Sequence, residues 1–157
     1  MASTITPATL NVTIREQITM NGTDYGGITR FAADNITEIS RRIVTTNGTG
    51  STTIIRFQPS ASAGQFINTD VRYLRITNLD DSNYATLRFR GTSATDYSFR
   101  LDPTGSHLLM TTQASGSSNA GVTSYADIAG VTLTDLRSIA ATANSASVNL
   151  ELFVASI

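Results

Sequence analysis

Alternation of apolar and polar side chains dominates residues 71–91, VRYLRITNLDDSNYATLRFRG, and it limits what this chain can fold into. Leu74 and Ile76 have one parity, whereas Tyr73 and Arg75 have the other. Successive side chains of a β-strand point to opposite faces, so this period of two predicts a strand with one apolar face. The alternation returns in the second half of this stretch. Its apolar residues of one parity are Ala85, Leu87 and Phe89, and the residues of the other parity are Tyr84, Thr86, Arg88 and Arg90.

These two strand patterns, joined by a short polar segment, predict a β-hairpin. The joining letters are NLDDSN, and Asp80, Asp81 and Asn83 can bond their own backbone there as Asx turns. The outer face is either a solvated polar surface or a contact surface for another subunit. Its candidate interface residues are Tyr73, Arg75, Tyr84, Arg88 and Arg90.

Further strand pairs are predicted around turn residues. ITEISRRIVTT and STTIIRFQP flank NGTG at residues 47–50, where Asn and Gly tolerate positive φ. YSFRLDPTGSHLLM predicts two strands around a turn at 102–105, and LNVTIREQITM predicts a strand that runs into the turn NGTDYGG. TDLRSIAATA and SVNLELFVASI form a last predicted hairpin, joined through Asn144 and Ser145. TDLRSIAATA also has helical spacing with Thr134 as its cap, but a strand is preferred because the final strand needs a partner.

Composition and length fit one β-rich domain. Ser and Thr are frequent along the 157 residues, and β-branched Thr favours a pleated surface. We therefore predict an all-β fold, a single antiparallel β-sandwich or jelly-roll-like domain over residues 1–157 with an N-terminal arm at 1–9. Residues 113–121 lack any large apolar side chain and are expected to be its most flexible part. The predicted inter-sheet core consists of Leu74, Ile76, Leu87, Phe89, Leu150, Leu152 and Val154.

The charge balance argues against two classes of partner. The 11 basic and 12 acidic residues give a net charge of -1, so no overall field draws the chain to nucleic acid or to an anionic membrane. We therefore expect neither partner. Every basic residue is Arg, which is enriched in protein interfaces, although a coding bias would equally remove Lys. No apolar run is long enough to span a bilayer, and the start MASTITPATLN lacks the pattern of a secretory signal.

No constellation of catalytic groups is visible. The sequence has no Cys and one His, His107, so a thiol nucleophile and a multi-His zinc site are excluded. His107 lies in the strand pattern SHLLM, where a hydrogen-bonded structural role is expected. We therefore expect neither enzyme activity nor a bound cofactor.

Two kinds of ligand binding stay open. Asp80, Asp81 and Asn83 supply neighbouring oxygen atoms that could hold a calcium ion, but Asx bonding accounts for them equally well, and no metal is expected. Tyr side chains could instead form a carbohydrate-binding face, although a Tyr on a half-buried sheet usually packs with its hydroxyl in water. The residues concerned are Tyr73, Tyr84 and Tyr97.

Several stretches of the second half resemble the small virion structural proteins of tailed bacteriophages, notably those of marine phages. They are RYLRITNLDDSNYATLRF, a turn with Pro and Gly, the strand GSHLLM and the ending ASVNLELFVASI. In such proteins a segment of the kind Arg-Ile-Thr-Asn-Leu-Asp precedes a strand, and the chain ends in Phe-Val-Ala-Ser. The resemblance runs from Val71 to the end of the chain.

This resemblance implies a β-sandwich or jelly-roll domain that sits in a phage particle as a multimer. We expect a capsid decoration or cement protein that bridges capsid subunits, made in the host cytoplasm and located in the virion. Its expected partners are other copies of itself, as a trimer, and virion proteins such as the major capsid protein. The alternative is a tail, neck or fibre component with a glycan-binding role.

Overall fold

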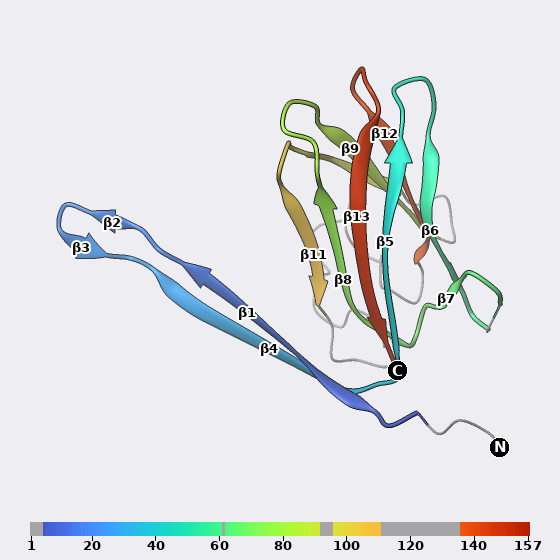
Figure 1. Cartoon of the computed structure of the whole chain (residues 1–157), viewed down its shortest axis with the longest axis horizontal. Helices are drawn as coiled ribbons and strands as arrows, with labels where there is room; N and C mark the ends of the chain where they lie inside the picture. Colours follow the sequence, from blue (N-terminus) through green and yellow to red (C-terminus); the bar gives the residue numbers. More distant parts are fainter. Residues whose placement is uncertain (1–4, 61, 92–95, 111–135) are drawn as a thin grey trace, which may run out of the picture.

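The computed structural model describes residues 5–60, 62–91, 96–110 and 136–157, and these residues form a β-sandwich with a long projecting hairpin (Figure 1). The strands of the sandwich are β5 (Glu38–Thr46), β6 (Thr52–Gln58), β7 (Phe66–Ile67), β8 (Val71–Asn78), β9 (Ala85–Gly91), β10 (Asp96–Leu101), β11 (Ser106–Met110), β12 (Leu136–Ala143) and β13 (Val148–Ser156). The strands of the hairpin are β1 (Ala8–Glu16), β2 (Thr19–Met20), β3 (Thr23–Asp24) and β4 (Gly27–Ile36). The flexible segment expected at 113–121 lies outside the described residues.

Two antiparallel sheets make the sandwich. One has the strand order β11-β8-β13-β5, and the other has the order β10-β9-β12-β6, with the short β7 pairing in parallel with β6. Strands that follow each other in the chain occupy matching places in the two orders: β5 and β6, β8 and β9, β10 and β11, β12 and β13. This is the connectivity of a jelly roll. The prediction of an all-β, antiparallel sandwich in a single domain is confirmed.

The predicted hairpins within the sandwich are wrong, although their strands are confirmed. The pairs β5 and β6, β8 and β9, and β12 and β13 are each divided between the two sheets, so each connection is an arch over the end of the sandwich (Figure 1). The reason is that alternation only shows which side chains share a face. A hairpin with two apolar faces side by side has the same pattern as an arch whose apolar faces meet across the core. The strand preferred over a helix near the C-terminus is confirmed as β12.

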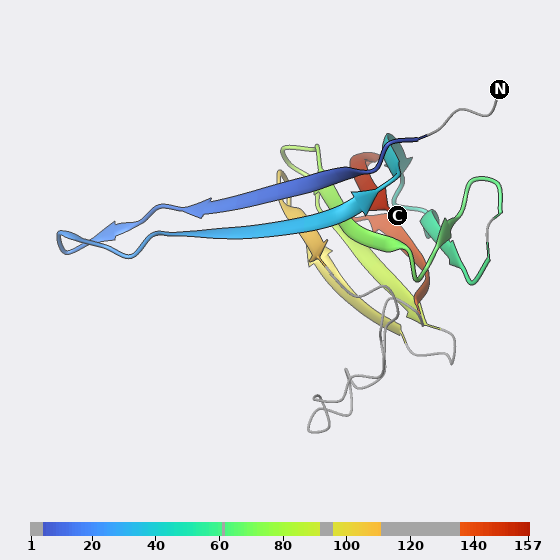
Figure 2. The same ribbon diagram turned by 90° about the horizontal axis from the view of Figure 1, so that it is seen from below.

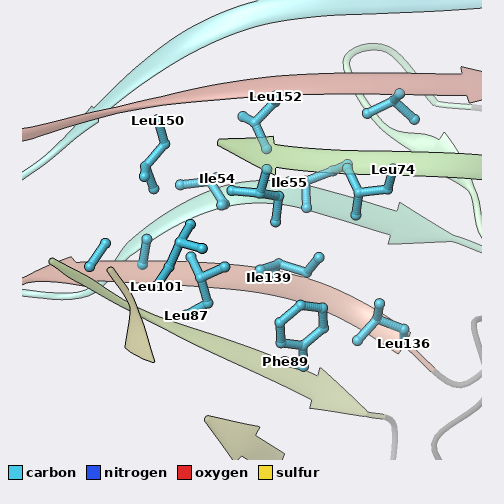
Figure 3. Close-up of a cluster of buried hydrophobic side chains, with 14 of the residues drawn as sticks. Ile54, Ile55, Leu74, Leu87, Phe89, Leu101, Leu136, Ile139, Leu150 and Leu152 are labelled. Atoms are coloured by element: carbon cyan, nitrogen blue, oxygen red, sulfur yellow. The ribbon is translucent and has the colours of Figure 1, made fainter. Parts of the chain in front are cut away.

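The inter-sheet core contains the whole predicted set, which is confirmed. These side chains are buried and belong to one cluster: Leu74, Ile76, Leu87, Phe89, Leu150, Leu152 and Val154. Figure 3 shows Leu74, Leu87, Phe89, Leu150 and Leu152 meeting between the sheets together with Ile54, Ile55 and Ile139. The added residues come from β6 and β12. Ile54 and Ile55 are consecutive and both buried, because a β-bulge opposite Ile139 and Ala140 interrupts the alternation of β6.

Two predicted turns are confirmed by their backbone geometry. Asn21 and Gly22 have φ of 51° and 79°, as a two-residue type I′ hairpin turn requires. In the turn at 102–105 the Gly105 N–H donates to the Asp102 carbonyl at 3.0 Å, and Thr104 has φ of 58°. Positive φ at the third position is the mark of a type II turn. These turns fix the tip of the projecting hairpin and the arch between β10 and β11.

The projecting hairpin crosses the outer face of the β11-β8-β13-β5 sheet and continues far beyond its β11 edge (Figures 1 and 2). Its base is held by a second apolar cluster, in which Leu10, Val12 and Phe31 pack over Tyr73 and Ala155. The hairpin runs from the start of β1 at Ala8 to the end of β4 at Ile36, so it reaches well past the arm expected at 1–9. The backbone of the outer half of the hairpin lies well away from the sandwich in both views.

Candidate functional site

The predicted interface residues lie at three separate places. Arg88 and Arg90 are on the outward side of β9, whereas Tyr73 and Arg75 are on the outward side of β8 in the opposite sheet. Tyr84 lies in the arch between these strands. One shared outer face was the wrong prediction, because β8 and β9 belong to different sheets. A role of each residue in subunit contact stays a prediction.

Of the two predicted arginines on β9, Arg88 is the more accessible. Its guanidinium forms an ion pair with Asp96 on the neighbouring strand β10, and its side chain is 47% exposed. Arg90 is partly buried, and within the part of the chain that the structure describes its Nε has no hydrogen-bond partner. Exposed ion pairs contribute little to stability, so Arg88 keeps donor capacity for another molecule.

On the β8 face, the projecting hairpin covers the residues that were expected to face outward. Tyr73 is only 5% exposed and meets Phe153 edge-to-face, with ring centroids 5.8 Å apart. Burial raises the pKa of the Tyr73 hydroxyl. Tyr73 is therefore a structural residue beneath the hairpin. A signal for this was present in the sequence, because the alternation of Leu10 and Val12 requires an apolar partner for one face of that strand.

Arg75 takes part in an ion triad beside the hairpin. The Glu151 carboxylate, 8% exposed, accepts hydrogen bonds from Arg41 at one oxygen and from Arg75 at the other, the latter at 3.1 Å. The hydrogen bond from Arg41 is the main cause that lowers the pKa of Glu151, and the charges of both arginines add to it. A hollow of about 490 Å³ lies between β1 and this triad. Arg75 therefore forms its ion pair within its own chain, with Glu151 of the neighbouring strand β13.

The three tyrosines considered for carbohydrate binding do not form a platform. The Arg100 guanidinium lies over the Tyr84 ring, with its central carbon 4.0 Å from the ring centre. Tyr97 stacks on Phe89 with centroids 4.7 Å apart, and Tyr73 is beneath the hairpin. The possibility that they line one face is not realised, since Tyr73 and Tyr97 belong to different sheets and Tyr84 to an arch.

The acidic arch at residues 80–83 is a hydrogen-bonded turn. Asp80 Oδ1 accepts the backbone N–H groups of Ser82 at 2.9 Å and of Asn83 at 2.6 Å, and these bonds lower the pKa of Asp80. Asp81 accepts the hydroxyl of Ser82 at 2.8 Å. Asx bonding therefore accounts for these residues, and among the described residues no three acidic or His side chains converge as a metal site would require.

His107 lies inside the sandwich among aromatic rings. Its ring contacts Phe99 with centroids 4.4 Å apart and Phe89 at 5.5 Å. The expected structural position is found, but Nε2 is buried and has no hydrogen-bond partner among the described residues, so the expected hydrogen bonding is not found there. Burial lowers the pKa of His107 because the charged imidazolium would lose its hydration.

We expect acid to destabilise the protein through His107. The unfolded chain takes up a proton as the pH falls through about 6.5, whereas the folded chain resists protonation until a lower pH. Stability should therefore fall progressively as the pH drops from about 7.5 through about 6.5 and below. The measurement is urea unfolding across this range for the wild type and His107→Leu. Because His107 is the only His, the variant should have a flatter profile. Parallel profiles would contradict a neutral, buried His107.

Large apolar side chains are exposed at two places that the sequence analysis missed. Ile18, Met20 and Tyr25, at the tip of the projecting hairpin, are 56%, 55% and 63% exposed. Ile39 and Ile43 on β5 are 60% and 63% exposed. For β5 the signal lay in ITEISRRIVTT, where Ile39 and Ile43 have the opposite parity from Val44. Both faces of that strand therefore carry apolar residues.

Comparison with known proteins does not identify the chain: no protein-family model matches it, and no curated protein matches its sequence. The described part of the chain contains no helix that is long and apolar enough to cross a membrane.

Proposed function

We propose that this chain is a structural protein of a tailed-phage particle and that it acts as a capsid decoration or cement protein. The observation that carries the proposal is the projecting hairpin, whose outer half exposes Ile18, Met20 and Tyr25 away from the body. A soluble domain rarely holds apolar side chains on a separate extension unless another molecule covers them. The resemblance of residues 71–157 to phage virion proteins supplies the biological setting.

The proposed partners are other copies of the chain, as a trimer, and virion proteins such as the major capsid protein. The jelly-roll body is suited to this role because its two sheets present two broad outer faces. One face is crossed by the projecting hairpin, and the other carries Arg88 and Arg90. We assign attachment to the capsid to this second face. Charge-assisted hydrogen bonds from its arginines contribute about 1.5 to 3 kcal/mol each when they are desolvated.

The test is to add purified protein to phage particles that lack it and to locate it by electron microscopy. We expect it on the capsid surface, and we expect decorated particles to resist heat better than bare ones. Arg88→Ala/Arg90→Ala should lower the occupancy, whereas Arg15→Ala, an exposed arginine on the projecting hairpin, should not.

Two outcomes would count against this proposal. Wild-type occupancy by the Arg88→Ala/Arg90→Ala protein would show that those arginines are merely solvated. Protein found only along the tail or neck would contradict the decoration role and favour the tail, neck or fibre alternative.

A further inference from the structure

The tip of the projecting hairpin has one apolar face. The Tyr25 N–H donates to the Ile18 carbonyl at 2.9 Å, so these two residues lie opposite each other. Met20 is two residues beyond Ile18 and pairs with Thr23, so it shares their face. The turn at Asn21 and Gly22 holds this arrangement. The tip therefore presents Ile18, Met20 and Tyr25 together as a small apolar surface.

Strand β5 presents a second apolar surface at the edge of the body. It pairs with β13 on one side only, so within the described residues its other edge has no partner strand. Ile39 and Ile43 point outward from it with Arg41 between them. An exposed edge strand with outward isoleucines is a site that natural proteins usually cover.

The two surfaces lie at opposite edges of the same sheet. In the order β11-β8-β13-β5 the hairpin leaves past β11, while β5 is the far edge (Figures 1 and 2). The tip of one copy is therefore directed away from its own β5. A second copy placed beyond the β11 edge brings its own β5 toward the tip. Such a contact joins two different surfaces, and repetition of it around a rotation axis closes a ring.

The charges of the two surfaces are complementary. Residues 16–28 of the hairpin contain Glu16 and Asp24 and no basic residue. Strand β5 contains Arg41 and Arg42 against one acidic residue, Glu38. Arg41, between the two isoleucines, is paired with Glu151, but its side chain is 70% exposed. Opposite charges at the rim of an apolar contact favour correct pairing and speed association.

We propose that the tip of the projecting hairpin docks on β5 of a second copy, where Ile18, Met20 and Tyr25 cover Ile39 and Ile43. This inference rests on the assembly role proposed above and names its homotypic interface. Each copy gives its hairpin to one neighbour and receives a hairpin from the other. The trimer is such a ring with three copies.

The first test measures the mass of the purified protein in solution by light scattering. We expect a closed oligomer for the wild type and a monomer for Ile18→Ser/Met20→Ser. The matched control is Ile28→Ser. Ile28 is 58% exposed on the same hairpin, but it pairs with Arg15 and lies on the face of the hairpin opposite to Ile18. This control should keep the wild-type mass. Circular dichroism should show that all three proteins are folded, since the altered residues are exposed.

The second test uses the absence of Cys from the chain to place single thiols. A Met20→Cys protein is co-expressed with a larger, tagged Ile43→Cys protein, and a short bis-maleimide links thiols that lie close together. We expect a product that contains one copy of each. The control pairs Met20→Cys with Leu79→Cys, whose side chain is 47% exposed in an arch of the sandwich, and should give little product.

A monomeric wild type, or equal linking to Leu79→Cys, would overturn the homotypic interface. The outcome is separable from the particle assay. A monomer that still decorates capsids through its hairpin would assign the tip to the capsid and leave the decoration role intact. A ring that binds no particle would keep the interface and remove the decoration role.

Discussion

Truncation of Phe89 to alanine is expected to lower the free energy of unfolding by about 3 to 5 kcal/mol. Phe89 is 1% exposed and lies between the sheets (Figure 3). Its ring stacks on Tyr97 and on Phe99, with centroid distances of 4.7 Å and 5.6 Å, and meets His107 edge-on. Strands in two sheets fix these neighbours, so they cannot close the space that the ring leaves, and the cavity adds to the lost burial.

Urea unfolding at neutral pH measures this loss. The matched control is Leu79→Ala, because Leu79 lies in the arch before β9 and is 47% exposed. Its effect should stay within about 0.5 kcal/mol. Equal stability of the Phe89→Ala and Leu79→Ala proteins would mean that β9 turns its other face to the core.

The strands and the core of this protein could be predicted from its sequence because burial leaves a direct trace in the alternation. Leu87 and Phe89 share a parity, and that parity is the inward one whichever strand lies beside β9. The pairing of strands leaves no such trace. The polar segment between β8 and β9 fits a hairpin tip as well as an arch, because Asx turns can close either connection.

The candidate site depended on pairing and could therefore be predicted only in part. Arg88 and Arg90 face outward, as their parity on β9 requires. They stay uncovered because the projecting hairpin crosses the other sheet. Tyr73 and Arg75 have the same outward parity on β8, but β1 and β4 pack over that face. Which sheet face a distant hairpin crosses is decided by packing between segments far apart in sequence, and alternation within one strand does not report it.

The buried side-chain amide of Asn78 joins two of the arches, which are also linked by backbone hydrogen bonds from the Asn78 N–H to the Gly105 carbonyl and from the Thr104 N–H to the Asp80 carbonyl. Asn78→Asp should therefore be among the most damaging single changes. Asn78 is 1% exposed, and its Nδ2 donates to the carbonyls of Asn83 at 2.8 Å, Leu101 at 3.3 Å and Asp102 at 3.2 Å. It thus joins the arch after β8 to the arch after β10. A carboxylate there would face three carbonyl oxygens without a proton to donate. We expect a loss of about 3 kcal/mol or more at neutral pH, because unsatisfied buried polar groups cost about 1 to 3 kcal/mol each and charged groups more.

The loss should depend on pH in a direction that separates it from a simple packing defect. Burial among carbonyl oxygens raises the pKa of the new carboxyl in the folded state above its ordinary value of about 3.9. The deficit of Asn78→Asp relative to the wild type should therefore shrink as the pH falls toward about 4, since a protonated carboxyl can donate one hydrogen bond. The control is Asn149→Asp, on an exposed position of β13, which should have little effect at any pH in this range. A pH-independent deficit, or none, would mean that the Asn78 amide does not hold these two arches together.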